Sequence, residues 1–383
     1  MKPARKTHPV IKIITIRILD LPAPINISLW WNYGSLLGLF LFIQIITGII
    51  LAIHYVPNIE LAFSSLTHIS RNVNWGWILH NSHINGASCF ILFIYLHIAR
   101  GIYYCSFRIK EVWNIGVRIF IASMATAFIG YVLPWGQIRF WGATVITNIF
   151  SAIPYTGKLL VEWLWGGFAV ANPTLSRFFI LHFILPLTII RLVILHIIFL
   201  HLRGSGNPMG INSNSDRSVF HHYYTTKDFI GFLLMLPIFI TVIMLTPNIL
   251  IDPENYIEAN TLITPTHIQP EWYFLWLYAI LRSIPNKLGG VVALLLAIFI
   301  LYSPSRFYLT KISIRFCPPI QIIFFLIINS WFILSWIGIC PVEQPFIIIG
   351  QIFRTAYFFF FLLLQATLNT WWNLNKLLLC YNK

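Results

Sequence analysis

Residues 76–104 read GWILHNSHINGASCFILFIYLHIARGIYY, an apolar run in which His83 and His97 lie 14 residues apart. As an α-helix this run would be about 43 Å long, which exceeds the roughly 30 Å hydrocarbon thickness of a bilayer. Fourteen residues are close to four helical turns. The two imidazoles are therefore expected within about 40° of one helix face and about 21 Å apart along the axis.

A second apolar run, residues 174–202, repeats this arrangement with His182 and His196, again 14 residues apart. Two helices that each present two imidazoles at one separation can hold two flat cofactors, one above the other. Neutral imidazole nitrogen is the ligand that b-type haem iron uses. A single membrane histidine is as often a hydrogen-bonded packing residue, but four at matched spacing on two spans predict a functional site.

Glycines repeat the same interval on two further apolar runs. Gly34 and Gly48 lie on the first, and Gly116 and Gly130 lie on the third. Small residues in membrane helices commonly mark helix–helix contacts. The shared interval of 14 favours a different role, in which these helices flank a wide, flat group and leave room for its ring. The first four spans are therefore predicted to form a four-helix bundle that binds two haems.

Composition places the chain in the membrane. Of its 383 residues 58% are hydrophobic and only 9% are charged, with a mean hydropathy of +0.78. No water-soluble core hides so much apolar surface. The predicted fold is all-α and integral to the membrane, with eight transmembrane helices and two parts, residues 1–205 and 206–383. The predicted spans are approximately 31–55, 76–104, 112–134, 174–202, 228–247, 288–308, 319–340 and 346–372.

The net charge of +14 fits loops held on the positive side of a membrane rather than a nucleic-acid surface. The basic segments are the N-terminus, the C-terminus and the loops after the second, fourth and sixth spans, which all fall on one side if there are eight spans (Arg108, Lys110, Arg203, Arg217, Lys227, Arg306, Lys311, Arg315, Lys376 and Lys383). Both termini are therefore predicted on one side. Residues 1–17 are predicted to form an amphipathic surface helix, and interfacial segments are predicted at 157–166 and 271–283. The five cysteines are scattered, which argues against disulfides and Cys-ligated metals.

Five stretches carry a family resemblance. They are residues 83–88 (HINGAS), 130–137 (GYVLPWGQ), 141–148 (WGATVITN), 270–273 (PEWY) and 281–290 (LRSIPNKLGG). With them the chain resembles the mitochondrial cytochrome b family over nearly its full length. The unbroken eight-span chain is similar to the respiratory form rather than to the plastid form, which is split into two polypeptides.

The resemblance implies two non-covalent b-type haems. His83 and His182 would bind a low-potential haem near the intermembrane space, and His97 and His196 a high-potential haem near the matrix. The implied haem environment also includes Gly34, Gly48, Gly116, Gly130, Ser35, His80, Arg100, Trp113 and Arg177.

The resemblance also implies two quinone sites. The implied quinol-oxidation site comprises Tyr131, Gly142, Pro270, Glu271, Trp272, Tyr273, Phe274 and Tyr278. The implied quinone-reduction site comprises His201, Ser205, Lys227 and Asp228. A carboxylate at the first site would accept a proton from quinol, and a histidine and an acid at the second would supply protons to quinone.

Two residues depart from the family pattern. The family has arginine at the position of His80, so one propionate of the low-potential haem would lack its usual cation. His80 is not the ligand itself, because it lies 17 residues before His97, about 100° off the common face. Arg191 occupies a position that is usually apolar in the family. It lies nine residues after His182, so it should point away from the haems and needs a polar partner.

The implied function is quinol:cytochrome c oxidoreduction by a Q-cycle in the mitochondrial inner membrane, with both termini in the matrix. The implied partners are a Rieske iron–sulfur protein, cytochrome c1, other subunits of the complex, membrane lipids and a second copy of the protomer, but no nucleic acid. A secondary transporter is one alternative, although it would not require the interval of 14. A dihaem ferric reductase is another, although it would need a dinucleotide-binding motif that this sequence lacks.

Overall fold

The computed structural model describes residues 7–307 and 313–381. Within these ranges eight helical spans are long and apolar enough to cross a membrane: Leu29–His54, Gly76–Tyr103, Lys110–Val132, Asn172–Arg203, Tyr223–Leu245, Lys287–Arg306, Pro318–Ile339 and Phe346–Trp371. They confirm the eight predicted spans, with every boundary within five residues. The predicted end at residue 308, and the basic residues Lys311 and Lys383, lie outside the described residues.

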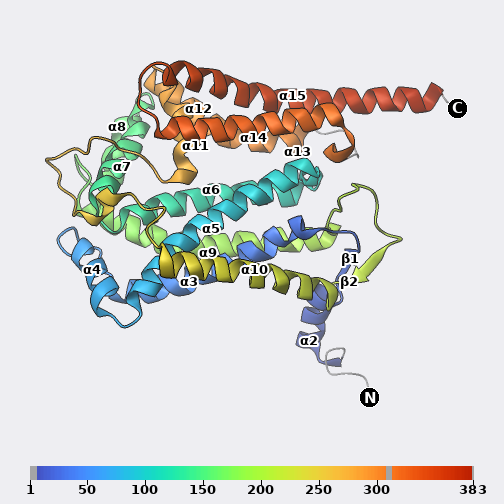
Figure 1. Ribbon diagram of the computed structural model, residues 1–383, viewed down its shortest axis with the longest axis horizontal. Helices are drawn as coiled ribbons and strands as arrows, with labels where there is room; N and C mark the ends of the chain where they lie inside the picture. Colours follow the sequence, from blue (N-terminus) through green and yellow to red (C-terminus); the bar gives the residue numbers. More distant parts are fainter. Residues whose placement is uncertain (1–6, 308–312, 382–383) are drawn as a thin grey trace.

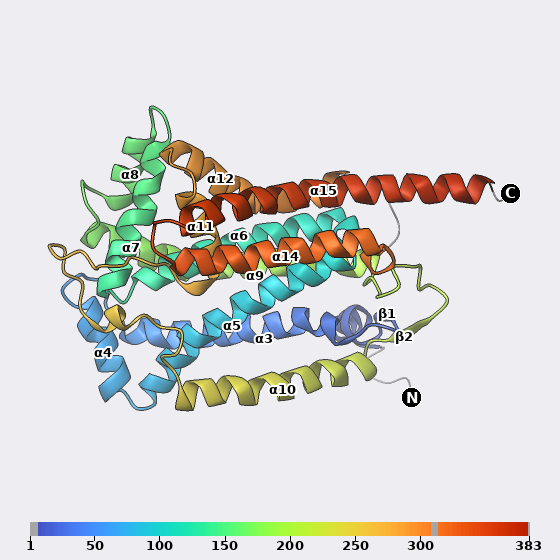
Figure 2. The same ribbon diagram turned by 45° about the horizontal axis from the view of Figure 1, so that its top comes forward.

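Four of these helices form the first bundle. They are α3 (Tyr33–His54), α5 (Gly76–Tyr103), α6 (Lys110–Val132) and α9 (Asn172–Arg203). Helix α3 packs along α5, and α6 packs along α9. Helix α10 (Tyr223–Leu245) packs beside α5 and α3, so it flanks the bundle at its lower edge (Figure 2).

The C-terminal helices form a second layer. It contains α12 (Lys287–Phe299), α13 (Ser303–Phe307), α14 (Pro318–Ile339) and α15 (Phe346–Tyr381). The short helix α11 (Leu275–Arg282) packs against α12, α14 and α15. Figure 1 shows this layer on one side of the bundle, with α10 on the other.

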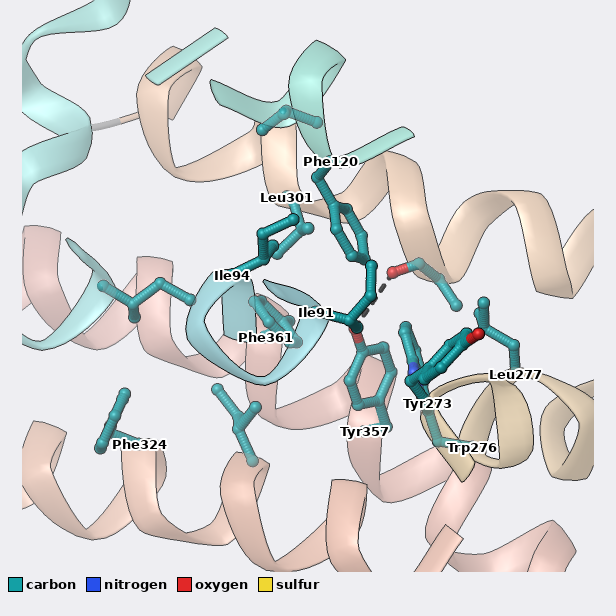
Figure 3. Close-up of a cluster of buried hydrophobic side chains, with 14 of the residues drawn as sticks. Ile91, Ile94, Phe120, Tyr273, Trp276, Leu277, Leu301, Phe324, Tyr357 and Phe361 are labelled. Carbon is teal, nitrogen blue, oxygen red and sulfur yellow. Dashed lines mark hydrogen bonds between the residues drawn. The ribbon is translucent and has the colours of Figure 1, made fainter. Parts of the chain in front are cut away.

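A cluster of buried side chains joins the two layers (Figure 3). Ile91 and Ile94 come from α5 and Phe120 comes from α6, while Trp276 and Tyr357 come from α11 and α15. Between membrane helices lipid is as apolar as the partner, so close van der Waals packing rather than loss of water stabilises such contacts. This packing holds α11 firmly against the bundle.

The two ends of the molecule differ. At one end lie α4 (Ala62–Asn72), α7 (Gln137–Asn148) and α8 (Gly157–Trp165) (Figure 1). Helix α8 and helix α11 fall in the predicted interfacial segments. Helix α4 was not predicted, because its sequence AFSSLTHISRN is amphipathic but short and as polar as a loop.

The other end holds a small sheet, in which β1 (Pro22–Pro24) pairs antiparallel with β2 (Arg217–Val219). Helix α2 (Pro9–Ile14) and the C-terminal end of α15 lie at this same end (Figure 1). That placement agrees with the prediction of both termini on one side. Residues 1–6 of the predicted surface helix lie outside the described residues.

Candidate functional site

The four predicted histidines form two pairs in the first bundle. The ring centroids of His83 and His182 lie 6.2 Å apart, and their planes cross at 82°. Those of His97 and His196 lie 6.3 Å apart, with an angle of 53°. Each pair joins α5 to α9, so the two pairs lie one above the other along the bundle. We call them the outer pair (His83 and His182) and the inner pair (His97 and His196).

These separations suit a metal ion between two imidazoles. A metal–imidazole bond is about 2.0–2.1 Å long, and the centre of an imidazole lies about 1.1 Å behind its nitrogen, so two such arms sum to roughly 6.3 Å. Among the described residues, no group of three or more His, Cys, Asp and Glu side chains is placed to hold a metal ion. Two imidazoles alone leave most coordination positions to another ligand, which fits haem, whose porphyrin supplies four nitrogens.

Hydrogen bonds fix the tautomer of the outer pair. His182 Nδ1 lies 3.0 Å from the carbonyl oxygen of Thr126, which only accepts, so this nitrogen carries the hydrogen. His83 Nδ1 lies 2.9 Å from the hydroxyl of Thr47, which itself lies 2.6 Å from the carbonyl of Ile43. Because that hydroxyl donates to the Ile43 carbonyl, it accepts from His83 Nδ1, which therefore carries the hydrogen as well. Both Nε2 atoms are then free to bind iron.

Each of the four glycines faces one histidine. A Cβ at Gly48 would lie 3.0 Å from His83 Cε1, and one at Gly34 would lie 3.6 Å from His97 Cε1. On α6, a Cβ at Gly116 would lie 3.2 Å from His196 Cε1, and one at Gly130 would collide with His182. The repeat of 14 thus has a local cause, because glycines on α3 leave space for histidines of α5, and glycines on α6 for those of α9.

A cavity of about 290 Å³ surrounds the outer pair. Its lining brings together several residues that the sequence assigned to two different sites: Gly48, His80, His83, Gly130, Tyr131, His182, Glu271 and Tyr273. The outer histidines and part of the implied quinol site therefore share one space, which we call the outer cavity.

The carboxyl group of Glu271 in this cavity is suited to proton transfer. Burial raises its pKa to about 7, while the positive charge of Arg139 pulls the pKa down and the nearby Asp252 pushes it up. Burial and the charge of Glu271 also raise the pKa of Tyr273. A carboxyl group with a pKa near neutrality can both accept and release a proton at physiological pH.

Arg139 was not among the residues predicted from the sequence. It is only 5% exposed and lines the outer cavity, and its guanidinium carbon lies 4.9 Å from the centre of the Tyr131 ring. The signal was present, because this arginine stands between the GYVLPWGQ and WGATVITN stretches, in a connection with few other bases.

A second cavity, of about 470 Å³, surrounds the inner pair, and we call it the inner cavity. All four residues of the implied quinone-reduction site line it, together with residues of the implied haem environment: Gly34, Ser35, His97, Arg100, Trp113, Gly116, His196, His201, Ser205, Lys227 and Asp228.

Polar contacts in the inner cavity link α3 to α10. The hydroxyl of Ser35 lies 2.9 Å from a carboxylate oxygen of Asp228, and Lys227 Nζ donates to the carbonyl of Ile27 at 2.5 Å. Arg100 stacks over Trp31 at 5.1 Å, and its Nε is buried with no hydrogen-bond partner among the described residues. This lining is rich in donors and positive charge, which suits carboxylate groups of a ligand.

Several predicted residues line neither cavity: Gly142, Arg177, Pro270, Trp272, Phe274 and Tyr278. Arg177 donates to the carbonyl of Trp163 at 2.6 Å and so faces α8. Trp272 donates to the hydroxyl of Ser88, which does line the outer cavity, at 3.3 Å. Arg191 is exposed and lines neither cavity, as its place on α9 predicted.

Comparison with known proteins agrees with this architecture. Residues 18–204 match the family model described as cytochrome b/b6/petB, and residues 258–358 match the one described as cytochrome b(C-terminal)/b6/petD. The fold is similar to a chain of a solved structure titled "Hyperthermophilic respiratory Complex III". The sequences are 32% identical, the match covers 95% of this chain and 97% of that chain, and the TM-score is 0.89.

Proposed function

The chain belongs to the cytochrome b family, and from this premise we propose that it is the electron-carrying membrane subunit of a ubiquinol:cytochrome c oxidoreductase. The observation that supports this most strongly is that two histidine pairs lie one above the other in the bundle. The ring centres are 6.2 Å apart within the outer pair and 6.3 Å apart within the inner pair, and each pair faces two glycines. Haem, when bound there, supplies a one-electron carrier. The two pairs together give the bundle one such position near each end.

The outer cavity is the proposed site of quinol oxidation. Quinol gives up two electrons and two protons to become quinone. Glu271, with its pKa of about 7, is suited to accept one of these protons. The phenol of Tyr131, which also lines this cavity, accepts a hydrogen bond from the amide nitrogen of Asn255 at 3.2 Å. The other predicted residues of this site (Gly142, Pro270, Trp272, Phe274 and Tyr278) would shape its entrance from α7, from α11 and from the segment that leads into α11.

The inner cavity is the proposed site of quinone reduction. Here quinone takes up two electrons and two protons. Asp228 and His201 would deliver the protons, while Ser35 orients the carboxylate of Asp228 through their 2.9 Å contact. Ser205 and Lys227 line the same space, and the lysine would hold a developing negative charge on a quinone oxygen.

The route of electrons determines the partners. One electron from each quinol would leave to an iron–sulfur protein of Rieske type, and the other would pass through this bundle to the inner cavity. The sequence has neither a CxxCH stretch for c-type haem nor a set of cysteines for an iron–sulfur cluster. The Rieske protein and cytochrome c1 would therefore be separate subunits, in a homodimer of multi-subunit protomers.

The proposed location follows the resemblance to mitochondrial relatives. The chain would lie in the mitochondrial inner membrane, with the basic end that carries α2 and the end of α15 in the matrix. Quinol oxidation at the opposite face would then release protons outside the matrix, which couples electron flow to proton translocation. Residues 1–205 would form the haem-binding part, and residues 206–383 would complete the two quinone sites.

The proposal is tested by adding ubiquinol to the purified complex. We expect reduction of b-type haem absorbance that requires quinol, and steady-state reduction of cytochrome c. A complex that contains b-type haem but is never reduced by any quinol would contradict the proposed reaction. Absence of b-type haem would favour a transporter.

A further inference from the structure

Arg139 is a buried cation with an unsatisfied donor. It stands in the first turn of α7, is 5% exposed, and its Nε has no hydrogen-bond partner among the described residues. The Tyr131 ring, 4.9 Å away, contacts the guanidinium by its face. A stacked ring does not satisfy the N–H groups, and a buried charge without an anion is strongly unfavourable.

The chain itself does not supply a close anion. The candidates are Glu271 and Asp252, because the carboxyl group of Glu271 interacts electrostatically with both Arg139 and Asp252. Neither pairs directly with Arg139, because the ion pairs recorded within the described residues are Lys158 with Glu162 and Arg203 with Glu111. The guanidinium is therefore free to meet an anionic ligand.

The outer cavity supports such a ligand. Arg139 is the only Lys or Arg among the described residues that line it, whereas Arg100, Arg108 and Lys227 all line the inner cavity. His80 lines the outer cavity as well, with Nδ1 3.2 Å from the hydroxyl of Ser70 and a buried Nε2 that has no partner among the described residues. Arg139 Nε and His80 Nε2, both buried without a hydrogen-bond partner among the described residues, thus belong to residues that line one cavity with the outer pair.

We propose that Arg139 is the positioning residue that binds a carboxylate of the group held between His83 and His182. His80 would add one hydrogen bond but no permanent charge. This inference rests on the proposed function, because haem brings two propionate carboxylates into the cavity. Charge-assisted hydrogen bonds from a guanidinium to a carboxylate are about twice as strong as neutral ones. In this proposal an arginine from α7 takes the role that the family resemblance implies for an arginine at position 80.

The charge of Arg139 should change the midpoint potential of the haem iron held by the outer pair. A nearby cation disfavours the more positive, oxidised iron and so raises the midpoint potential. In the purified complex, Arg139→Gln should lower the potential of one b-type haem by about 59 mV, a tenfold change in a one-electron equilibrium. The haem of the inner pair serves as an internal control and should not change. Arg139→Lys, which keeps the charge, should stay near the parent value.

Arg71→Gln is the matched control, because Arg71 is an exposed arginine in α4, the helix that packs on the N-terminal part of α5. It removes the same charge from the same end of the molecule and should leave both potentials unchanged. The double variant His80→Arg with Arg139→Gln returns the cation to the family position and should restore the potential.

Each outcome has a defined meaning. If Arg139→Gln binds both haems at parental potentials, Arg139 only packs on Tyr131 and the inference is wrong. If Arg139→Gln does not assemble, the double variant decides: parental potentials support a cavity cation, and continued failure to assemble overturns it. If the parent complex lacks haem at the outer pair, the proposed function itself fails, which is a separate result.

Discussion

The phenol of Tyr95 donates a 2.6 Å hydrogen bond to the backbone carbonyl of Tyr273. The phenol oxygen of Tyr95 in turn accepts a hydrogen bond from the indole N–H of Trp276 at 2.9 Å. Tyr95 stands in α5, between the outer and inner histidines, while Tyr273 lines the outer cavity beside Glu271. The helix that carries His83 and His97 is thus bonded directly to the segment that carries the proposed proton acceptor.

Removal of this hydroxyl should destabilise the complex. Tyr95→Phe leaves the carbonyl of Tyr273 and the N–H of Trp276 without a partner in a buried layer, which costs about 1–3 kcal/mol for each unsatisfied group. We expect a lower thermal unfolding midpoint, measured by intrinsic fluorescence of the purified complex. Tyr155→Phe is the control, because Tyr155 is 100% exposed. Equal midpoints for both variants would show that the two hydrogen bonds do not stabilise this contact.

Glu271→Gln should slow quinol oxidation while both haems stay bound. Glu271 accepts a proton only when ionised, so with a pKa of about 7 the parental rate should fall as the pH drops below 7. The variant should be about 100-fold slower and lose this inflection. The control is Glu258→Gln, because Glu258 is exposed. A variant with the parental rate and pH profile would remove Glu271 from the mechanism.

Alanine at Gly130 or Gly48 should expel the outer haem. The new methyl group would press on His182 or His83, and overpacking of this kind costs about 1–3 kcal/mol, equivalent to roughly 5- to 150-fold weaker binding. Haem content per chain, measured as the pyridine haemochrome, should fall toward one. Gly167→Ala is the control, because a Cβ there meets no atom within 4 Å. Full haem content in both test variants would mean that these glycines serve only helix packing.

Asp228→Asn should impair the inner cavity alone. The amide keeps a contact to Ser35 but cannot deliver a proton, so reoxidation of the haems by added quinone should slow by about tenfold or more. The initial reduction of the haems by quinol at the outer cavity should keep its parental rate. Asp216→Asn, at an exposed aspartate, provides the control. If reoxidation kept its parental rate, Asp228 would not be a proton donor.

The spans and the histidine pairs were predictable because both depend on local pattern. An apolar run of sufficient length must be a membrane helix, and residues 14 apart must share a face. The sequence also indicated that the glycine helices flank the cofactors. It did not show which glycine faces which histidine, because that depends on how α3 packs on α5 and α6 on α9.

Features that depend on distant contacts were missed. Strands β1 and β2 pair residues such as Pro22 and Val219, which no local pattern connects. Arg139 meets Tyr131 only because the chain reverses at Trp135, which has a left-handed backbone with φ 56°. Likewise, the resemblance predicted Arg177 near a haem, whereas its contact with the Trp163 carbonyl depends on the docking of α8 against α9.

The most direct test of the two-haem arrangement is the haem-to-chain ratio of the purified complex, before and after the change His182→Ala. The outer and inner pairs predict two b-type haems per chain in the parent and one in the variant, with the midpoint potential of the remaining haem close to that of the parental inner haem. A parent with fewer than two b-type haems, or a variant that retains both, would contradict the assignment of His83 with His182 and of His97 with His196.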